Sequence, residues 1–198
     1  MLPIAALGDK FFRRLIEIDE DTCRRVAEAG CPNCGGPLHR GDYPRKPRGG
    51  LIAVAGEAFT RRLSLCCGWT GCRRRATPPS VRFLGRRVYL GVTVVLASIA
   101  ALAASRPREV RRATGIPHRT VSRWRAWWQT DFPKSRLFEQ ERGRFMPPLE
   151  VVALPASLVE RFVAAACDIN AAIVRTLGFL APLTTASVGD GSRFVRVR

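Results

Sequence analysis

Acidic residues are scarce in this chain of 198 residues: 16 aspartates and glutamates stand against 33 lysines and arginines, for a formal net charge of +17. The imbalance is greatest between Ala58 and Thr130, which contain fifteen arginines and a single acid, Glu109. After Thr130 no strand-rich segment presents the cluster of carboxylates that a two-metal nuclease requires. The composition therefore argues against such an enzyme and favours a polyanionic partner, with nucleic acid ahead of an anionic membrane.

Long apolar runs are missing as well. The most hydrophobic stretch, residues 89–104, is shorter than the ~20 residues that a membrane-spanning helix needs, and Gly91, Thr93 and Ser98 interrupt it. The first residues lack the basic segment and the apolar core of a secretory signal. We therefore expect a cytoplasmic protein without membrane association, in which residues 89–104 form a buried helix.

Cysteine, in contrast, occurs seven times. Cys31 and Cys34 have the spacing of a metal-binding knuckle and are followed by two glycines, which leave room for the backbone to turn. A second group, Cys66, Cys67 and Cys72, follows about thirty residues later. Without a secretion signal, this pattern indicates a metal ion rather than disulfides. We predict a Zn²⁺ site formed by Cys31, Cys34, Cys67 and Cys72, with Cys66 as the alternative to Cys67.

The segments between the two cysteine groups are predicted to be antiparallel strands, at residues 37–48 and 57–65, because polar and apolar residues alternate from Arg61 to Leu65. A closed four-thiolate site has no open position for water, so the predicted metal is structural rather than catalytic. His39 is an outside candidate ligand, but we expect it at the surface or facing a phosphate. Cys23 and Cys167 lie in helical patterns and are expected to be ordinary packed residues.

Residues 105–128 are predicted to form two short helices joined by a turn. Ser105 is a suitable N-cap for the first helix, and Gly115 supplies the positive φ that a tight helix-to-helix turn requires. Pro117 fixes φ for the start of the second helix, at residues 117–129. Apolar residues at helical spacing then bury one face of the second helix: these are Val121, Trp124 and Trp128.

The other face of this second helix is polar and basic, which suits a nucleic-acid groove. Arginine in particular forms bidentate contacts with phosphate and guanine. The residues expected to face bases are His118, Arg119, Ser122 and Arg123. Those expected nearer phosphates are Thr120 and Arg125. Six cations flank the predicted metal site and are expected to hold the DNA backbone: Arg45, Lys46, Arg48, Arg73, Arg74 and Arg75.

Together the two motifs resemble the N-terminal DNA-binding region of bacterial transposases and other mobile-element proteins, in which a zinc ribbon precedes a helix-turn-helix. The resemblance covers about residues 25–130 and rests on the Cys31–Cys34 pair, residues 62–75, the Thr-Pro-Pro-Ser segment at 77–80 and the Gly115 turn. It implies a bacterial, nucleoid-associated protein that recognises element ends, while a separate catalytic transposase domain or subunit cuts the DNA.

The predicted fold is mainly α with a small zinc-bound β-ribbon and a helix-turn-helix domain. We divide it into an N-terminal helical arm (1–30), a zinc ribbon (31–79), a helix-turn-helix domain (80–132), and a linker with a C-terminal helical region (133–198). The arm is expected to form one or two helices, with the run from Asp19 to Thr22 offering the start of a second helix, and its charged residues are expected to be solvated. Residues 134–148 are expected to be a linker with a helical turn, and residues 189–198 a flexible basic tail. Apolar residues at helical spacing from Leu158 to Leu183 would either pack onto the core, form a homodimer or dock a partner.

The sequence therefore predicts a zinc-containing, sequence-specific, double-stranded DNA-binding protein without catalytic activity of its own. The resemblance makes it an accessory component of a mobile element. A transcriptional regulator would use the same DNA-binding chemistry and remains an alternative. A zinc module that binds RNA or protein, with the helical hairpin as scaffold only, is a further alternative.

Overall fold

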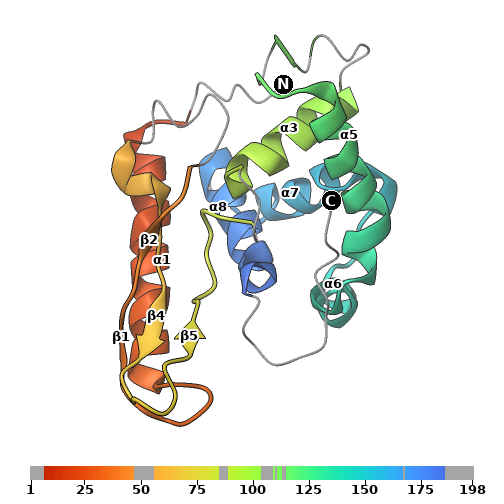
Figure 1. Cartoon of the computed structure of the whole chain (residues 1–198). Helices are drawn as coiled ribbons and strands as arrows, with labels where there is room; N and C mark the ends of the chain where they lie inside the picture. Colours follow the sequence, from red (N-terminus) through yellow and green to blue (C-terminus); the bar gives the residue numbers. More distant parts are fainter. Residues whose placement is uncertain are drawn as a thin grey trace.

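The computed structural model describes residues 7–46, 56–84, 89–103, 109, 111–112, 115–166 and 168–185, and it is mainly helical with short strands (Figure 1). The helices are α1 (Asp9–Ala29), α3 (Gly91–Ala103), α5 (His118–Ala126), α6 (Arg136–Glu141), α7 (Ala156–Val163) and α8 (Ile169–Leu180). The strands are β1 (Leu38–Arg40), β2 (Tyr43–Pro44), β3 (Arg61–Arg62), β4 (Leu65–Cys67) and β5 (Arg75–Ala76). The prediction of a mainly α fold with a small β part is confirmed.

Several single helical turns connect these elements. A π-helical turn, η3 (Trp127–Asp131), extends α5 beyond its last residue. The others are the 3₁₀ turns η2 (Glu57–Thr60), η4 (Phe132–Lys134), η5 (Arg142–Arg144), η6 (Val151–Ala153) and η7 (Ala181–Thr184).

The main hydrophobic core lies between α3, α5, α7 and α8 and extends to the first half of α1. Leu15, Phe59, Val95, Trp128 and Leu177 are among its buried residues. A second, much smaller cluster lies beside the strands and contains Cys23, Leu63, Leu65 and Ala76. The main core thus spans the predicted division of the chain at Pro78–Pro79.

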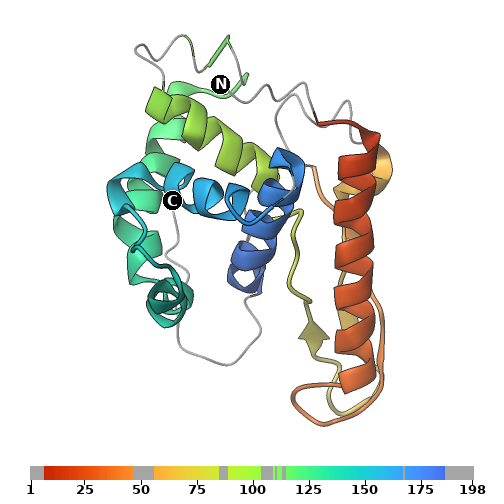
Figure 2. The same ribbon diagram turned by 180° about the vertical axis from the view of Figure 1, so that it is seen from behind.

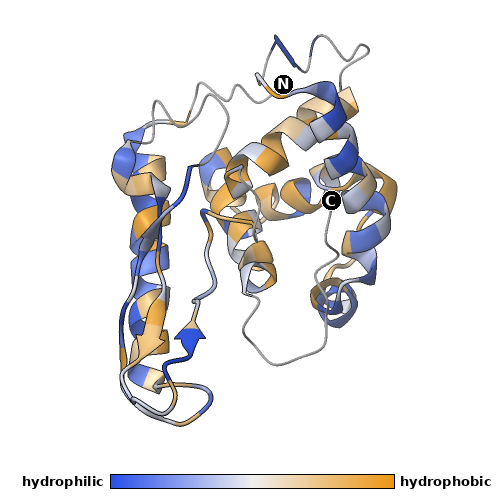
Figure 3. Ribbon diagram, in the orientation of Figure 1, coloured by the Kyte–Doolittle hydropathy of each residue, from blue (hydrophilic) through white to orange (hydrophobic). Residues whose placement is uncertain are grey.

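Helix α3 is the buried helix expected from residues 89–104. Nine of its residues are buried, and it packs against α5. The indole Nε1 of Trp128 donates a hydrogen bond of 3.1 Å to Ser98 Oγ, so the polar atoms between the two helices are paired. Figure 3 shows α3 mostly in the hydrophobic colours, whereas α5 carries several hydrophilic turns. Among the described residues, no helix has the length and apolar character to cross a membrane.

Helix α1 is a single helix, so the arm contains one helix rather than two, and the run from Asp19 to Thr22 does not begin a second helix. The expectation that the charged residues of this segment are solvated also fails at Asp19, which is 1% exposed. Its carboxylate accepts hydrogen bonds from Ser80 Oγ (2.6 Å), the Val81 backbone N–H (2.7 Å) and Arg82 Nε (2.7 Å). Arg82, which neutralises this carboxylate, lies 63 residues further along the chain. The sequence around Asp19 therefore shows only a run of acidic residues and gives no sign that one of them is buried.

The strands are shorter than predicted, and they form two antiparallel groups. In the three-stranded sheet, β4 lies between β1 and β5, with Leu38 opposite Cys67. Strands β2 and β3 pair separately. The predicted strand at 57–65 is wrong over its first four residues, which form η2 and bring the Phe59 ring within 5.1 Å of the Phe12 ring. Burial does not alternate along 62–65, where every residue is buried.

The C-terminal region contains two helices, α7 and α8, separated by a break at residues 164–168. Asp168 caps α8 by accepting a hydrogen bond of 2.8 Å from the Ala171 backbone N–H, a preferred role for aspartate. Leu177 lies so close to Gly91 that a Cβ at Gly91 would come within 3.2 Å of it. The buried face of α8 therefore packs onto the core, which is the first of the alternatives expected for this region.

Residues 134–148 contain helical structure as expected, in α6 and η5. They are not a loose linker, because they contribute Phe138 and Phe145 to the core. The Phe132 and Phe138 rings lie 5.2 Å apart, edge to face. Such aromatic contacts hold a segment that reads as mixed and charged in the sequence. The predicted tail at 189–198 and Cys167 lie outside the described residues.

Candidate metal centre and nucleic-acid interface

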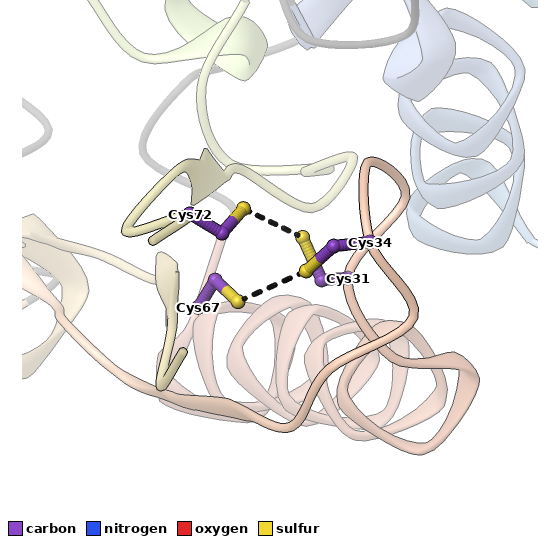
Figure 4. A group of neighbouring side chains, drawn as sticks. All are labelled: Cys31, Cys34, Cys67 and Cys72. Carbon is purple, nitrogen blue, oxygen red and sulfur yellow. Dashed lines mark hydrogen bonds between the residues drawn. The ribbon is translucent and has the colours of Figure 1, made fainter. Parts of the chain in front are cut away.

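Four cysteines from two loops lie together at one end of α1 (Figure 4). Cys31 and Cys34 lie in the loop after α1, Cys67 ends β4, and Cys72 lies in the loop between β4 and β5. Their sulfur atoms all lie within 4.8 Å of one another. The Sγ atoms of Cys31 and Cys72 are 3.8 Å apart, and those of Cys34 and Cys67 are 3.5 Å apart.

This spacing fits a tetrahedral metal ion. Metal–sulfur bonds of about 2.3 Å place the sulfurs of a tetrahedral four-thiolate site roughly 3.8 Å apart. The four residues are the set predicted from the sequence. Cys66 is not among them, since its Sγ lies 3.5 Å from the Arg73 carbonyl oxygen. The exposed His39 of β1 is not part of the cluster either.

Tight backbone turns shape both cysteine loops. In the first loop, the Gly35 N–H donates to the Cys31 carbonyl (2.8 Å), and the Cys31 N–H donates to the Gly36 carbonyl (2.9 Å). Gly30 has a φ of +78°, and a Cβ on it would come within 2.9 Å of the Gly35 oxygen, so this position needs glycine. In the second loop, the N–H groups of Cys72 and Arg73 both donate to the Trp69 carbonyl at 3.0 Å.

Backbone N–H groups point at the sulfurs and favour thiolates. The N–H of Arg74 is the main cause that lowers the pKa of Cys72 to about 6. At Cys34 the N–H of Gly36 also favours the thiolate, but desolvation and the neighbouring thiols outweigh it and raise the pKa to about 12. Burial likewise raises the pKa of Cys67. The chain alone therefore favours one thiolate, and a bound cation would favour ionisation of the others.

Helix α5 presents the second candidate site. Its inner face is buried as predicted, with exposed fractions of 1% for Val121, 3% for Trp124 and 0% for Trp128. The Trp124 ring contacts the Tyr89 ring edge to face, at 5.0 Å between centroids. Its outer face lines an open hollow of about 540 Å³. The residues lining this hollow are the four expected to face bases: His118, Arg119, Ser122 and Arg123.

The prediction that Thr120 lies near phosphates is wrong, because Thr120 is only 9% exposed. It is one helical turn from Trp124, so both residues lie on the face that packs into the core. Arg125, in contrast, is exposed as expected. On the outer face, Ser122 Oγ lies 3.2 Å from His118 Nε2, which links two of the side chains that were expected to face bases.

The segment before α5 is described only in part. Glu109, Arg111 and Arg112 are helical, and Gly115 has a φ of +68°. The Gly115 N–H donates to the Arg111 carbonyl at 2.8 Å, which is how a glycine ends a helix in the left-handed conformation. Ser105, the predicted N-cap of this helix, lies outside the described residues.

The six cations predicted around the metal site have different surroundings. Arg73, Arg74 and Lys46 are exposed. Arg75 donates to the Gly41 carbonyl and to Ser64 Oγ, both at 2.9 Å. The half-buried Arg45 guanidinium lies 5.3 Å from the centroid of the Phe83 ring. Arg48 lies outside the described residues. Arg73, Arg74 and Arg75 are all exposed, and Arg73 and Arg74 lie in the loop between β4 and β5.

Sequence reasoning missed one exposed aromatic residue in that loop. Trp69 is 58% exposed, although its sequence position between Cys67 and Cys72 suggested only a turn. The signal available was a large aromatic residue between two glycines, Gly68 and Gly71, in a segment flanked by arginines.

No protein-family model, curated protein or solved structure matches this chain. The functional interpretation therefore depends on the geometry of the four cysteines, on the exposed face of α5 and on the charge of the molecule.

Proposed function

We propose that this protein binds double-stranded DNA in a sequence-specific manner, with α5 as the recognition helix of a helix-turn-helix. The observation that carries the proposal is the division of α5 into two faces. Val121 and Trp124 fix the inner face in the core, while Arg119 and Arg123 are exposed on the outer face. A recognition helix needs this combination, because its base-reading side chains must be held by a rigid support.

The major groove of DNA accepts a helix of this kind. Arginine pairs with the O6 and N7 acceptors of guanine, and serine and histidine supply further hydrogen-bonding groups. The turn at Gly115 would set the angle between α5 and the preceding helical residues. A net charge of +17 supplies the long-range attraction to phosphate. The resemblance to mobile-element proteins extends the proposal to an accessory subunit that acts with a separate catalytic partner.

The four cysteines would hold Zn²⁺, which two features support: the all-thiolate donor set and the sulfur spacing. When bound, the ion would supply folding energy to the two loops. The chain's own contribution is to orient the sulfurs through the N–H groups of Gly36, Trp69 and Arg74. Since all four positions would be filled by sulfur, the role that we propose for this site is structural.

A selection experiment tests the DNA proposal. The zinc-loaded protein is incubated with a pool of random duplexes, and the bound fraction is sequenced. We expect an enriched motif that loses information at defined positions in Arg119→Ala and Arg123→Ala, because each bidentate base contact contributes about 1–3 kcal/mol of discrimination. Arg13→Ala, on an exposed residue of α1, is the matched control and should leave the motif unchanged. Binding without any motif, equal in all variants, would contradict the proposal.

A further inference from the structure

Trp69 is exposed on the loop between β4 and β5, beside the metal centre. Its exposed fraction is 58%, whereas Trp124 and Trp128 are 3% and 0% exposed. A single exposed apolar side chain is common on protein surfaces, so what distinguishes Trp69 is how its loops hold the ring and which charges its loop carries. Figure 2 shows the two cysteine-bearing loops together at the lower end of α1, on the opposite side of the molecule from α5.

The indole is held in place by the loops that surround it. A Cβ at Gly36 would come within 3.2 Å of Trp69 Cγ and 3.3 Å of Cδ2, so the ring lies directly against the backbone of the first cysteine loop. The Trp69 carbonyl accepts hydrogen bonds from two N–H groups, those of Cys72 and Arg73. The backbone N–H of Trp69 points at the Cys67 sulfur. The side chain is therefore presented at the surface by a rigid support.

The loop that carries this ring also carries two exposed arginines. Arg73 and Arg74 are exposed and follow Cys72 directly. Arg73 has a φ of +46° and is the single non-glycine residue with positive φ among the described parts of the chain. Glycine would adopt this conformation at lower cost. The chain nevertheless has an arginine at this position. Such strain occurs preferentially at functional positions.

We propose that Trp69, Arg73 and Arg74 form a binding surface for single-stranded DNA, in which an unpaired base stacks on the indole and the two arginines contact the flanking phosphates. Every base has a π face, so stacking of this kind tolerates any sequence. In an intact duplex the bases stack on one another and offer no free face to the indole. The Trp69 surface would therefore bind single-stranded DNA, whereas α5 would bind the duplex.

The inference rests on the proposed function in one respect, since both assign nucleic acid as the ligand. A protein partner is the weaker match, because one exposed indole on a loop with two exposed arginines lacks the apolar core of a stable protein interface. Aromatic side chains on which bases stack, together with cations that contact the backbone, are instead common in proteins that bind single strands.

The test measures binding of a fluorescently labelled oligothymidylate to the full-length, zinc-loaded protein at low salt. We expect Trp69→Ala to weaken binding about fivefold to a hundredfold, and Trp69→Phe, which keeps a smaller ring, to weaken it less. Val152→Ala removes exposed apolar area elsewhere, since Val152 is 67% exposed, and should change nothing. Zinc content is measured for each variant. Equal affinity of Trp69→Ala and wild type would overturn the inference.

Tryptophan fluorescence provides a readout that does not depend on the stability of Trp69→Ala. Stacking of a base on Trp69 should quench part of the wild-type emission, and this quenching should be absent in Trp69→Phe. Quenching that persists in Trp69→Phe would overturn the inference. It would also be overturned if Trp69→Ala lost only self-association or binding to a protein partner, with its affinity for oligothymidylate unchanged.

The two proposals fail separately in this experiment. Arg119→Ala and Arg123→Ala should bind oligothymidylate like wild type, and Trp69→Ala should still select the duplex motif. Oligothymidylate binding that depends on Trp69 without any duplex motif would contradict only the function assigned to α5. A duplex motif without binding that depends on Trp69 would contradict only the inference about the Trp69 surface.

Discussion

The cysteine-bearing region and the helical region differ in what holds them together. Beside strands β1, β4 and β5 the buried hydrophobic cluster consists of Cys23, Leu63, Leu65 and Ala76. The helical region instead shares a large core formed by α3, α5, α7 and α8. So small a cluster cannot stabilise a loop-rich segment, which is why small folds often need a metal ion. The comparison predicts that the cysteine-bearing region depends on a bound metal ion and that the helical region does not.

Helix α1 belongs to both regions. Phe11, Phe12 and Leu15 near its start lie in the main core, whereas Cys23, two turns further on, lies in the small cluster. Between them, Asp19 accepts hydrogen bonds from Ser80 and Arg82, which follow the last strand. The two regions are therefore joined by one continuous helix and one buried ion pair, and each of the following predictions perturbs one region and observes the other.

The largest expected effect is the loss of the metal centre in Cys34→Ser. Structural zinc sites contribute apparent binding free energies of about 10–16 kcal/mol, so we expect loss of bound zinc and rapid amide hydrogen exchange in β4. The helical region should keep its circular dichroism and its cooperative unfolding. Elemental analysis and hydrogen exchange give the two readouts.

Cys66→Ser is the matched control for this change, because Cys66 adjoins a ligand without being one. It should retain zinc, and Cys67→Ser should lose it. The reverse result would show that the sulfur of Cys66 is the fourth ligand. Simultaneous unfolding of α3 and α5 in Cys34→Ser would contradict the division into a metal-held and a core-held region.

Breaking the buried ion pair is expected to have the next largest effect. Asp19 and Arg82 are each 1% exposed, and removing one partner leaves an uncompensated buried charge. We expect Asp19→Asn to lower the free energy of unfolding by about 3–5 kcal/mol, as measured by urea denaturation. Asp21→Asn is the control, since Asp21 pairs with Arg24 at the surface and should change stability by less than about 1 kcal/mol. Similar effects of the two variants would contradict this assignment.

Gly115→Ala is expected to have the smallest effect of these changes on stability. No atom lies within 4 Å of a Cβ built on Gly115, so the cost comes from its φ of +68° alone. We expect about 1 kcal/mol of destabilisation in the helical region, with zinc content unchanged. Gly143 is equally open but has no positive φ, and Gly143→Ala should show no comparable loss. Calorimetry measures the loss of stability, and elemental analysis shows whether the zinc content of the cysteine-bearing region is unchanged.

Local patterns in the sequence were enough to predict the cysteine cluster and the two faces of α5. Metal-ligand spacing identifies Cys31 and Cys34, and helical spacing identifies Val121 and Trp124, because both signals lie within a few residues. The buried helix at residues 89–104 has the same kind of signal.

Features that depend on distant partners were not predictable in this way. The burial of Asp19 requires Arg82, which is 63 residues away, and a single sequence gives no sign of that pairing. Thr120 reads as a polar residue suited to phosphate, but its position on the helix places it in the core. The η2 turn exists because Phe59 packs on Phe12, a tertiary contact that outweighs strand propensity.

The central claim, that α5 recognises DNA through its exposed face, is tested most directly with two double variants of equal net charge. Arg119→Ala/Arg123→Ala removes two cations from α5, and Arg13→Ala/Arg25→Ala removes two exposed cations from α1. Each is titrated with a duplex selected by the wild-type protein. We predict a loss of at least about tenfold in affinity for the α5 variant and a clearly smaller loss for the α1 variant. Equal losses would show that only net charge attracts DNA, and would contradict the assignment of α5 as a recognition helix.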